Sequence, residues 1–275
     1  MIEGHTADTI FDIERAVLSA ETFLRDCLAQ SHMAGYVVGL SGGIDSALST
    51  TLASRAVGQT KVLGVLMPYR TSSENSITDA TELAGQLGIE YRTVDISPMI
   101  DAYYSEITDK TALRAGNKMA RERMSILFDI AHEANRLVLG TGNRTEICLG
   151  YTTWYGDAAC SVNPIGQLYK TEVRTLSRNL GVPQSIIDKP PSADLWVGQT
   201  DEGEIGITYE TIDRLLRRLI DDGITSRTSL KSEGFATSDI DTVVSLLNKN
   251  SFKRALPQVA SLGRAEIPQT IELQP

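Results

Sequence analysis

Cysteine and histidine are scarce in this sequence, and their placement excludes two kinds of structural site. The 275 residues include three cysteines and three histidines. No two cysteines form a C-x-x-C pair, and the histidines lie far apart along the chain. We therefore expect neither a disulfide framework nor a structural zinc site. An odd number of cysteines is also typical of a reducing compartment.

Long apolar runs and an excess of positive charge are missing as well. No run of about 18 apolar residues occurs, so we expect no membrane span. The first residues lack the basic start and apolar stretch of a secretory signal. The net charge of −9 disfavours a nucleic-acid partner, because proteins grip the phosphate backbone with clusters of Lys and Arg. These absences predict a cytoplasmic protein with no membrane or nucleic-acid partner.

The composition that remains is that of a folded domain. Hydrophobic residues make up 41% of the chain, and the 22 glycines bring the share to the usual value for globular proteins. We find no internal repeat, low-complexity tract or linker. The length suits one large α/β domain, so we predict that residues 1–275 form a single domain.

Short apolar strands alternate with longer helices in the first half of the chain. The predicted strands are Tyr36–Leu40, Lys61–Met67, Glu90–Ile96 and Arg136–Gly140. The predicted helices cover residues 8–30, the segment that ends near residue 57, and residues 74–87 and 115–134. This alternation predicts an α/β fold with a doubly wound, mostly parallel sheet and helices on both faces.

The second half of the chain predicts loops and a helical C-terminal appendage. Residues 150–170 show no sustained period and predict a long loop, and loops of that length are often functional. A second loop is predicted over residues 188–206, where two adjacent prolines exclude a helix. Helices are predicted at residues 171–180, 208–222 and 237–249.

A glycine-rich turn, SGGIDS at residues 41–46, joins the first predicted strand to a helix. Gly42 and Gly43 permit a sharp turn with exposed N–H groups, and the N-terminus of the helix adds positive charge. These features predict an anion cradle, in which Asp45 suits a Mg²⁺ ion that bridges to phosphates. The lysine of a Walker loop is missing. The alternative is an ordinary turn in which Asp45 or Ser46 caps the helix.

The turn resembles the pyrophosphate loop of the ATP pyrophosphatases, and later motifs resemble one family among them, the NAD synthetases. These motifs are GTGNRTE at 140–146, GYTT at 150–153, LYKTEV at 168–173, PSADL at 191–195 and Asp201-Glu202 with Gly206-Ile207. The resemblance runs from about residue 12 to residue 257. It implies an adenine nucleotide alpha hydrolase-like fold and a ligase that joins deamido-NAD to ammonia. ATP is consumed through a deamido-NAD adenylate, and NAD, AMP and pyrophosphate are released.

The resemblance also implies an ATP site with Mg²⁺. Its residues are Gly39, Leu40, Ser41, Gly42, Gly43, Ile44, Asp45, Ser46, Thr141, Lys170 and Ser192. Asp45 and Glu146 hold the metal, and Lys170 neutralises charge that develops on the phosphates. Other interpretations remain open at this point: Glu146 as a first-turn residue that complements the helix dipole, Thr141 as an N-cap, and Lys170 as a solvated surface residue.

On the acceptor side, the resemblance implies contacts with deamido-NAD. The implied residues are Arg121, Trp154, Ser161, Phe252 and Lys253. Three of them depart from the commonest family pattern, because Trp154 replaces Lys, Ser161 replaces Asp and Phe252 replaces His. The departures leave room for a different carboxylate substrate. Arg121 has a plainer interpretation as a partner of a carboxylate on its own helix, such as Glu122 or Asp129.

The family pattern assigns Asp157 to the ammonia step. Ammonium dominates at neutral pH, and a carboxylate that attracts it and takes its proton would release the nucleophile. A Gly-Asp pair in an ordinary turn is the alternative.

The source of ammonia and the assembly follow from the same resemblance. The 40 residues before the turn predict one helix, which leaves no room for a glutaminase domain. Free ammonia or a separate glutaminase subunit would then supply the nitrogen. A homodimer is expected, with the first helix and the helix at 115–134 as candidate interfaces. The competing hypotheses are an amide ligase for another carboxylate and a non-catalytic ATP-binding module, which would not need both Asp45 and Glu146.

Overall fold

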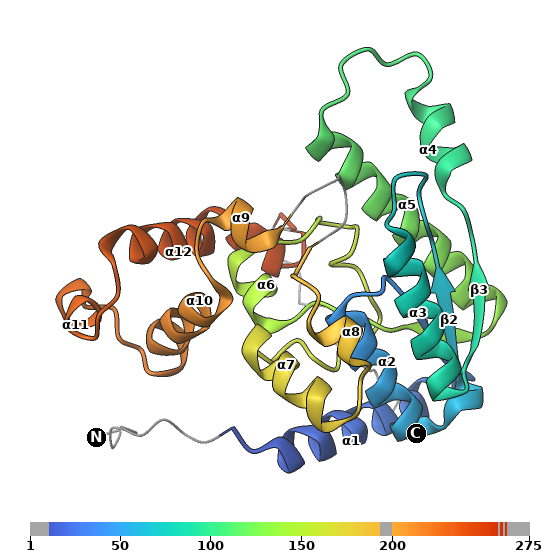
Figure 1. Cartoon of the computed structure of the whole chain (residues 1–275), viewed down its shortest axis with the longest axis horizontal. Helices are drawn as coiled ribbons and strands as arrows, with labels where there is room; N and C mark the ends of the chain where they lie inside the picture. The colour runs from blue at the N-terminus through green and yellow to red at the C-terminus, as the bar shows by residue number, and fades with distance from the viewer. Residues whose placement is uncertain (1–10, 193–199, 258, 261, 263–275) are drawn as a thin grey trace.

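The computed structural model of the chain describes residues 11–192, 200–257, 259–260 and 262 (Figure 1). Its centre is a sheet of four parallel strands in the order β3-β2-β1-β4. The strands are β1 (Gly35–Gly39), β2 (Val62–Leu66), β3 (Glu90–Thr93) and β4 (Arg136–Val138). The predicted parallel sheet is confirmed, although the third and fourth strands end earlier than expected.

The strand order creates a switch point between β1 and β4. The chain moves outward from β1 through β2 to β3 and then crosses back to the other side of β1. In open parallel sheets of this kind, the loops that follow the two central strands diverge and leave room for a ligand. The SGGIDS turn follows β1, and the segment that contains Thr141 follows β4.

Helices cover both faces of the sheet, as predicted. Tyr36 and Val38 of β1 lie in one apolar cluster and Val37 in another, because successive side chains of a strand point to opposite faces. The first face is covered by α1 (Ile13–Ser31), α2 (Ile44–Val57), α3 (Glu74–Leu87) and α7 (Lys170–Asn179). The second face is covered by α4 (Ser97–Tyr104) and α5 (Ala112–Glu133).

The C-terminal helices form a third apolar cluster to one side of the sheet (Figure 1). They are α10 (Tyr209–Leu216), α11 (Arg227–Ser232) and α12 (Thr237–Lys249). α10 and α12 pack on α6 (Arg144–Leu149), and α10 also contacts α7. The predicted helical appendage is therefore joined to the sheet through the two helices that carry Glu146 and Lys170.

The structure corrects the predicted loop at residues 188–206. A short helix, α9 (Asp201–Ile205), lies in its second part. The Thr200 side chain accepts a hydrogen bond from the Gly203 N–H and begins the helix, and Gly206 ends it in the left-handed conformation. The prolines at 190 and 191 restrict only their own neighbourhood, so they do not prevent a helix ten residues later.

Other helix predictions need smaller corrections. The helix predicted at 208–222 is an α-helix only to Leu216, and a π-helical turn (Arg217–Asp221) follows. The helices α4, α8 (Gln184–Ile187) and α11 were not predicted. In the part of the chain that the structure describes, no helix has the length and apolar character needed to span a membrane.

Candidate active site

The SGGIDS turn has a shape that only glycine permits at one position. Gly42 has a φ of 73°, and a Cβ atom there would lie 2.2 Å from the Ser76 carbonyl oxygen. The Ser46 hydroxyl donates to the Gly43 carbonyl at 3.0 Å and accepts from the Ser41 hydroxyl at the same distance. Gly43 is the N-cap of α2 and no side chain caps that helix, so the interpretation of Asp45 or Ser46 as a cap is wrong.

Lys170 brings two predicted metal ligands together. Its ammonium donates to Oδ2 of Asp45 at 2.5 Å and to Oε1 of Glu146 at 3.2 Å. Asp45 lies in the first turn of α2, Glu146 in the first turn of α6, and Lys170 begins α7. Lys170 is 2% exposed, so its interpretation as a solvated surface lysine is wrong.

A capping box sets the position of Glu146. The Asn143 side chain accepts from the Glu146 N–H at 2.9 Å, and Oε2 of Glu146 accepts from the Asn143 N–H at 3.3 Å. The other oxygen, Oε1, remains directed at Lys170. The N-cap of α6 is Asn143, not Thr141, and its amide nitrogen also donates to Oδ1 of Asp45 at 2.8 Å.

The burial of this cluster shifts the pKa values of its members. Burial raises the pKa of Glu146 to about 8, with Lys170 opposing this rise and the charge of Asp45 adding to it. Burial alone would lower the pKa of Lys170, but the carboxylates of Asp45 and Glu146 outweigh it and raise the value. The raised pKa of Lys170 favours its charged ammonium form.

The donor set of this cluster fits Mg²⁺. Asp45 and Glu146 offer hard carboxylate oxygens within reach of one cation, since the Lys170 ammonium contacts both. Within the described residues, no group of three or more His, Cys, Asp and Glu side chains is arranged to hold a metal ion. Mg²⁺ commonly uses only one or two carboxylates and completes its shell with waters and substrate phosphates.

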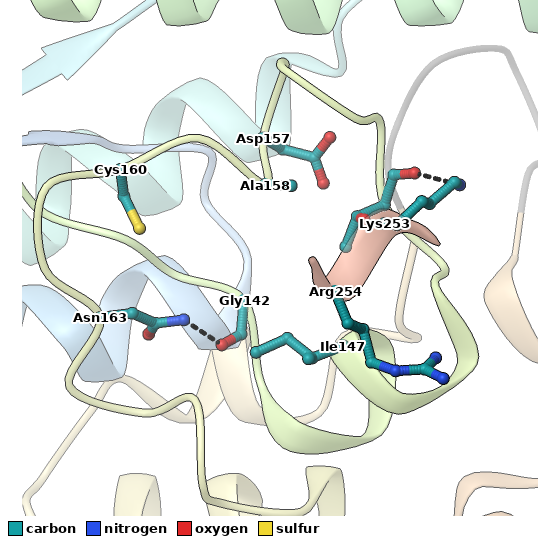
Figure 2. Close-up of a pocket in the computed structure, with 9 residues that line it drawn as sticks. Gly142, Ile147, Asp157, Ala158, Cys160, Asn163, Lys253 and Arg254 are labelled. Carbon is teal, nitrogen blue, oxygen red and sulfur yellow. Dashed lines mark hydrogen bonds between the residues drawn. The ribbon is translucent and has the colours of Figure 1, made fainter. Parts of the chain in front are cut away.

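A cavity of about 180 Å³ lies next to α6 (Figure 2). It is lined by Gly142, Ile147, Thr152, Asp157, Ala158, Cys160, Asn163, Lys253 and Arg254. Asp157 accepts a hydrogen bond from the Thr153 N–H at 2.7 Å, and Lys253 donates to the carbonyls of Gly150 and Thr152. Burial raises the pKa of Asp157, which favours its protonated form, and lowers the pKa of Lys253.

Aromatic side chains gather near this cavity. The rings of Trp154 and Phe252 meet edge to face with centroids 5.2 Å apart, and Tyr155 stacks on Trp154 at 4.5 Å. Nε of Arg121 donates to the Trp154 carbonyl at 3.2 Å. The structure therefore places Arg121 from α5 beside two predicted acceptor residues that lie far from it in the sequence.

The chain is similar to known proteins over most of its length. Residues 16–257 match the model of the NAD synthase family. The chain belongs to the NAD synthase family. It is 48% identical to an NH(3)-dependent NAD(+) synthetase of Fusobacterium nucleatum over 88% of this chain and 93% of the relative.

Two solved structures of the same kind share the fold. An NMN synthetase from Francisella tularensis is 33% identical with a TM-score of 0.81, covering 92% of this chain and 100% of its own. An NH3-dependent NAD synthetase from Campylobacter jejuni, solved with nitrate, is 34% identical with a TM-score of 0.78, covering 91% and 99%. The α/β fold predicted from the sequence is that of the NAD synthase family.

The remaining predicted site residues, Ser161 and Ser192, lie outside the helices and strands. The hydroxyl of Ser161 accepts from the Val138 N–H at 3.1 Å, which ties the loop to the end of β4. Ser192 is exposed at the end of the described segment that precedes α9, and the rest of its motif, residues 193–195, lies outside the described residues. Glu122 pairs with Lys118 on its own helix, whereas Arg121 reaches the Trp154 carbonyl.

Sequence reasoning did not identify Lys189 as a neighbour of the SGGIDS turn. Its ammonium donates to the Ser76 hydroxyl at 2.9 Å, to Asp79 at 3.0 Å and to the Gly42 carbonyl at 3.4 Å. It therefore ties the SGGIDS turn to the first turns of α3. The only sequence signal near Lys189 is the proline pair that follows it. Its hydrogen-bond partners lie about 110 to 147 residues away in the sequence.

Asp201 was also assigned no role from the sequence. It is 4% exposed, and its Oδ2 accepts from the Tyr209 hydroxyl at 3.0 Å. The ring of Tyr209 lies 5.3 Å from the Lys170 ammonium. The Asp201-Glu202 pair is one of the motifs that resemble the NAD synthetases. Its position in the sequence did not indicate that α9 would bring Asp201 close to Lys170.

Proposed function

We propose that this chain is an ammonia-dependent NAD synthetase, which amidates deamido-NAD and converts ATP to AMP and pyrophosphate. One observation carries the proposal: Lys170 holds Asp45 and Glu146 together at the switch point of a NAD synthase fold. The Fusobacterium relative, which matches over nearly its whole length, bears the name NH(3)-dependent NAD(+) synthetase. An amide ligase for an unrelated carboxylate is not favoured.

The reaction consists of two displacements. A carboxylate oxygen of deamido-NAD attacks the α-phosphorus of ATP, and the bond to pyrophosphate breaks to leave an adenylate. The nitrogen of ammonia then attacks the acyl carbon, and AMP leaves with the bonding electron pair. The amide nitrogen gives up its extra proton to a base. Both steps need charge stabilisation on phosphate oxygens, and the second also needs neutral ammonia.

The ATP side of the site is suited to the first displacement. The SGGIDS turn and the N-terminus of α2 offer N–H groups for phosphate oxygens, and Thr141 and Ser192 offer hydroxyls. Lys170 supplies a fixed positive charge to the departing pyrophosphate. Asp45 and Glu146 would hold Mg²⁺, which neutralises phosphate charge when bound.

The acceptor side of the site is suited to an aromatic dinucleotide. Arg121 can donate to a pyrophosphate, and Trp154 and Phe252 offer ring faces and edges to an adenine or pyridine ring. Lys253 and Ser161 complete the proposed deamido-NAD contacts. Asp157, which lines the cavity beside them, would receive the ammonium proton. Burial raises the pKa of this carboxyl group, so its carboxylate form binds a proton more tightly than an ordinary aspartate does.

We further propose a homodimer. Large apolar side chains are exposed on both predicted interface helices, Leu18 and Phe23 on α1 and Leu113 and Phe128 on α5. A second chain packed on these helices would remove their apolar side chains from water. The mass of the purified protein in light scattering tests this, with about 60 kDa expected, twice the 29.9 kDa of one chain. A mass of one chain at micromolar concentration would contradict it.

The activity is tested by incubating the protein with Mg-ATP, ammonium and deamido-NAD while NAD and AMP are followed together. We expect the two products to appear one for one. A parallel reaction contains nicotinic acid mononucleotide, because one structural neighbour is an NMN synthetase. Faster amidation of the mononucleotide would overturn the proposed acceptor but keep the chemistry. Bound ATP with neither product would favour a non-catalytic module instead.

A further inference from the structure

Lys170 has a third carboxylate close to it, beyond the two proposed metal ligands. Asp201 is the first residue of α9, and the Tyr209 hydroxyl donates to its Oδ2 at 3.0 Å. The face of the same tyrosine ring lies 5.3 Å from the Lys170 ammonium. Tyr209 is fully buried, so it joins the two charged groups inside the protein without intervening bulk solvent.

One oxygen of Asp201 is left without a partner. Its Oδ1 is buried and accepts no hydrogen bond from any residue that the structure describes. The nearby Tyr151 hydroxyl donates to Glu204 and also interacts with the Asp201 carboxyl group. An unpaired buried carboxylate oxygen costs free energy, so such oxygens are rare in native proteins. The cation that most stabilises the charged form of Asp201 is Lys170, which lowers a pKa that burial raises.

The backbone around Asp201 holds its carboxyl group in a fixed place. The Asp201 N–H donates to the Pro191 carbonyl at 3.0 Å, and the Thr200 side chain caps α9. The Tyr209 N–H donates to Oε1 of Glu202 at 2.8 Å, which joins the start of α10 to α9. A charged group on such a framework can position a neighbour accurately, because its own rotamer is restrained.

The proposed function changes the surroundings of Lys170. Asp45 and Glu146 would hold Mg²⁺, and carboxylate oxygens that bind this cation would be less available to the lysine. A buried ammonium that loses both anionic partners is strongly destabilised unless another anion stays near it. We propose that Asp201, with Tyr209, is a positioning residue for Lys170. It keeps the Lys170 ammonium in place and directed at the phosphates when Asp45 and Glu146 coordinate the metal. This inference rests on the proposed function of Lys170.

Steady-state kinetics of Asp201→Asn test the inference. The substitution keeps the shape of the Asp201 side chain and removes its negative charge. We expect kcat to fall at least tenfold while KM for ATP changes less than about twofold, since Lys170 stabilises charge that develops in the transition state. Tyr209→Phe should lower kcat in the same direction by a smaller factor. Glu210→Gln, which removes the charge of an exposed carboxylate on α10, is the control, and its kcat should stay within about twofold of the wild type.

A double-mutant cycle separates positioning from a merely structural role. In a Lys170→Met background, Asp201→Asn should lower kcat no further, because the residue through which it acts is already gone. Additive losses would overturn the inference. An unchanged kcat in Asp201→Asn alone would also overturn it. A melting temperature close to that of the wild type shows that the variant folds, and Asp201→Glu, which restores the charge, should recover part of the rate.

Crystal structures with Mg²⁺ and pyrophosphate test the inference without turnover. In the wild type, we expect Nζ of Lys170 to move off Asp45 and Glu146, contact pyrophosphate and stay beside Asp201. In Asp201→Asn, Nζ should lose this position. If Nζ remains on Asp45 in the wild-type complex, the inference is wrong whatever the acceptor is. If the protein makes no NAD but Lys170 moves as expected, the proposed function fails and the positioning role stands.

Discussion

Lys170 and Glu146 show how one buried contact changes the chemistry of single residues. The lysine lies 125 residues from Asp45 in sequence, yet its ammonium contacts Oδ2 of that residue at 2.5 Å. Burial works against every charge in the cluster, so the charge of each group depends on its neighbours. Removing one partner therefore leaves another buried charge uncompensated.

Glu146→Gln tests the metal role at the scale of one residue. The amide keeps the shape of the side chain but is a poor ligand for Mg²⁺, so we expect AMP formation to fall by about 100-fold or more. ATP binding measured by calorimetry should weaken only a few-fold, because the SGGIDS turn is intact. Glu133→Gln, at an exposed pair with Arg92, is the control and should leave turnover unchanged. Turnover that survives Glu146→Gln would refute the metal assignment.

The raised pKa of Glu146 predicts how stability depends on pH. Its pKa moves from 4.5 to about 8 in the folded, metal-free protein. Between these values the folded state holds a proton that the unfolded chain has released. The stabilisation of the folded state by this bound proton is complete below pH 4.5 and is lost as the pH rises through about 8. We expect the free energy of unfolding in urea with a chelator to fall over this window more steeply for the wild type than for Glu146→Gln. Equal slopes would contradict the shifted pKa.

At the scale of elements, local sequence explains where the site begins. The SGGIDS turn fits between β1 and α2 because Gly42 takes a left-handed conformation against α3, and the capping box of α6 turns Glu146 inward. Both features follow from a few neighbouring residues. The short helix α9 also has a local cause, the Thr200 cap, but a five-residue helix has too little periodicity to be detected among loop residues.

Gly42→Ala tests the turn. Its φ of 73° and the 2.2 Å approach to the Ser76 carbonyl leave no room for a methyl group. We expect a loss of stability of about 2 kcal/mol or more and a loss of ATP binding, measured by urea unfolding and calorimetry. Gly181→Ala is the matched control, since its φ is 74° but nothing lies within 4 Å of the added atom. It should cost about 1 kcal/mol and leave ATP binding intact. A similar cost at both positions would show that contact with α3 is unimportant.

At the scale of the whole molecule, the packing of distant segments forms the two sides of the site. The carboxyl ends of β1 and β4 lead into the proposed ATP side. The acceptor side combines Arg121 of α5, the loop with Trp154 and the 3-10 helix Ser251–Arg254 with Phe252. The predicted homodimer and cytoplasmic location also belong to this scale, and they stay predictions.

Trp154→Ala tests the acceptor side. The substitution removes the ring that contacts Phe252 and Tyr155, so the proposed aromatic surface for deamido-NAD is lost. We expect KM for deamido-NAD to rise about tenfold while KM for ATP changes little. Tyr91→Ala, at an exposed aromatic residue of β3, is the control and should alter neither constant. A selective rise in KM for ATP would place Trp154 on the other side of the site.

The amino-acid sequence alone was enough to predict the four strands in order, the long helices between them, the parallel sheet, the glycine turn and the family. Periodic apolar residues such as Val17, Leu24 and Leu28 of α1, and the continuous apolar run of β1, report burial directly along the chain. The proposed roles of Asp45, Glu146 and Lys170 were inferred from the resemblance to the NAD synthetases. These features depend on residues that are close in sequence, so local sequence patterns are enough to predict them.

Which side chains contact one another depends on tertiary packing, and the sequence did not predict it. The burial of Lys170 between two carboxylates, the tie from Lys189 to Gly42, and the approach of Asp201 through Tyr209 join residues from separate helices. No local periodicity encodes such contacts, because they depend on how α2, α6, α7 and α9 pack around the sheet edge. The charges that these groups carry depend in turn on that packing, since burial and the nearest opposite charge set each pKa.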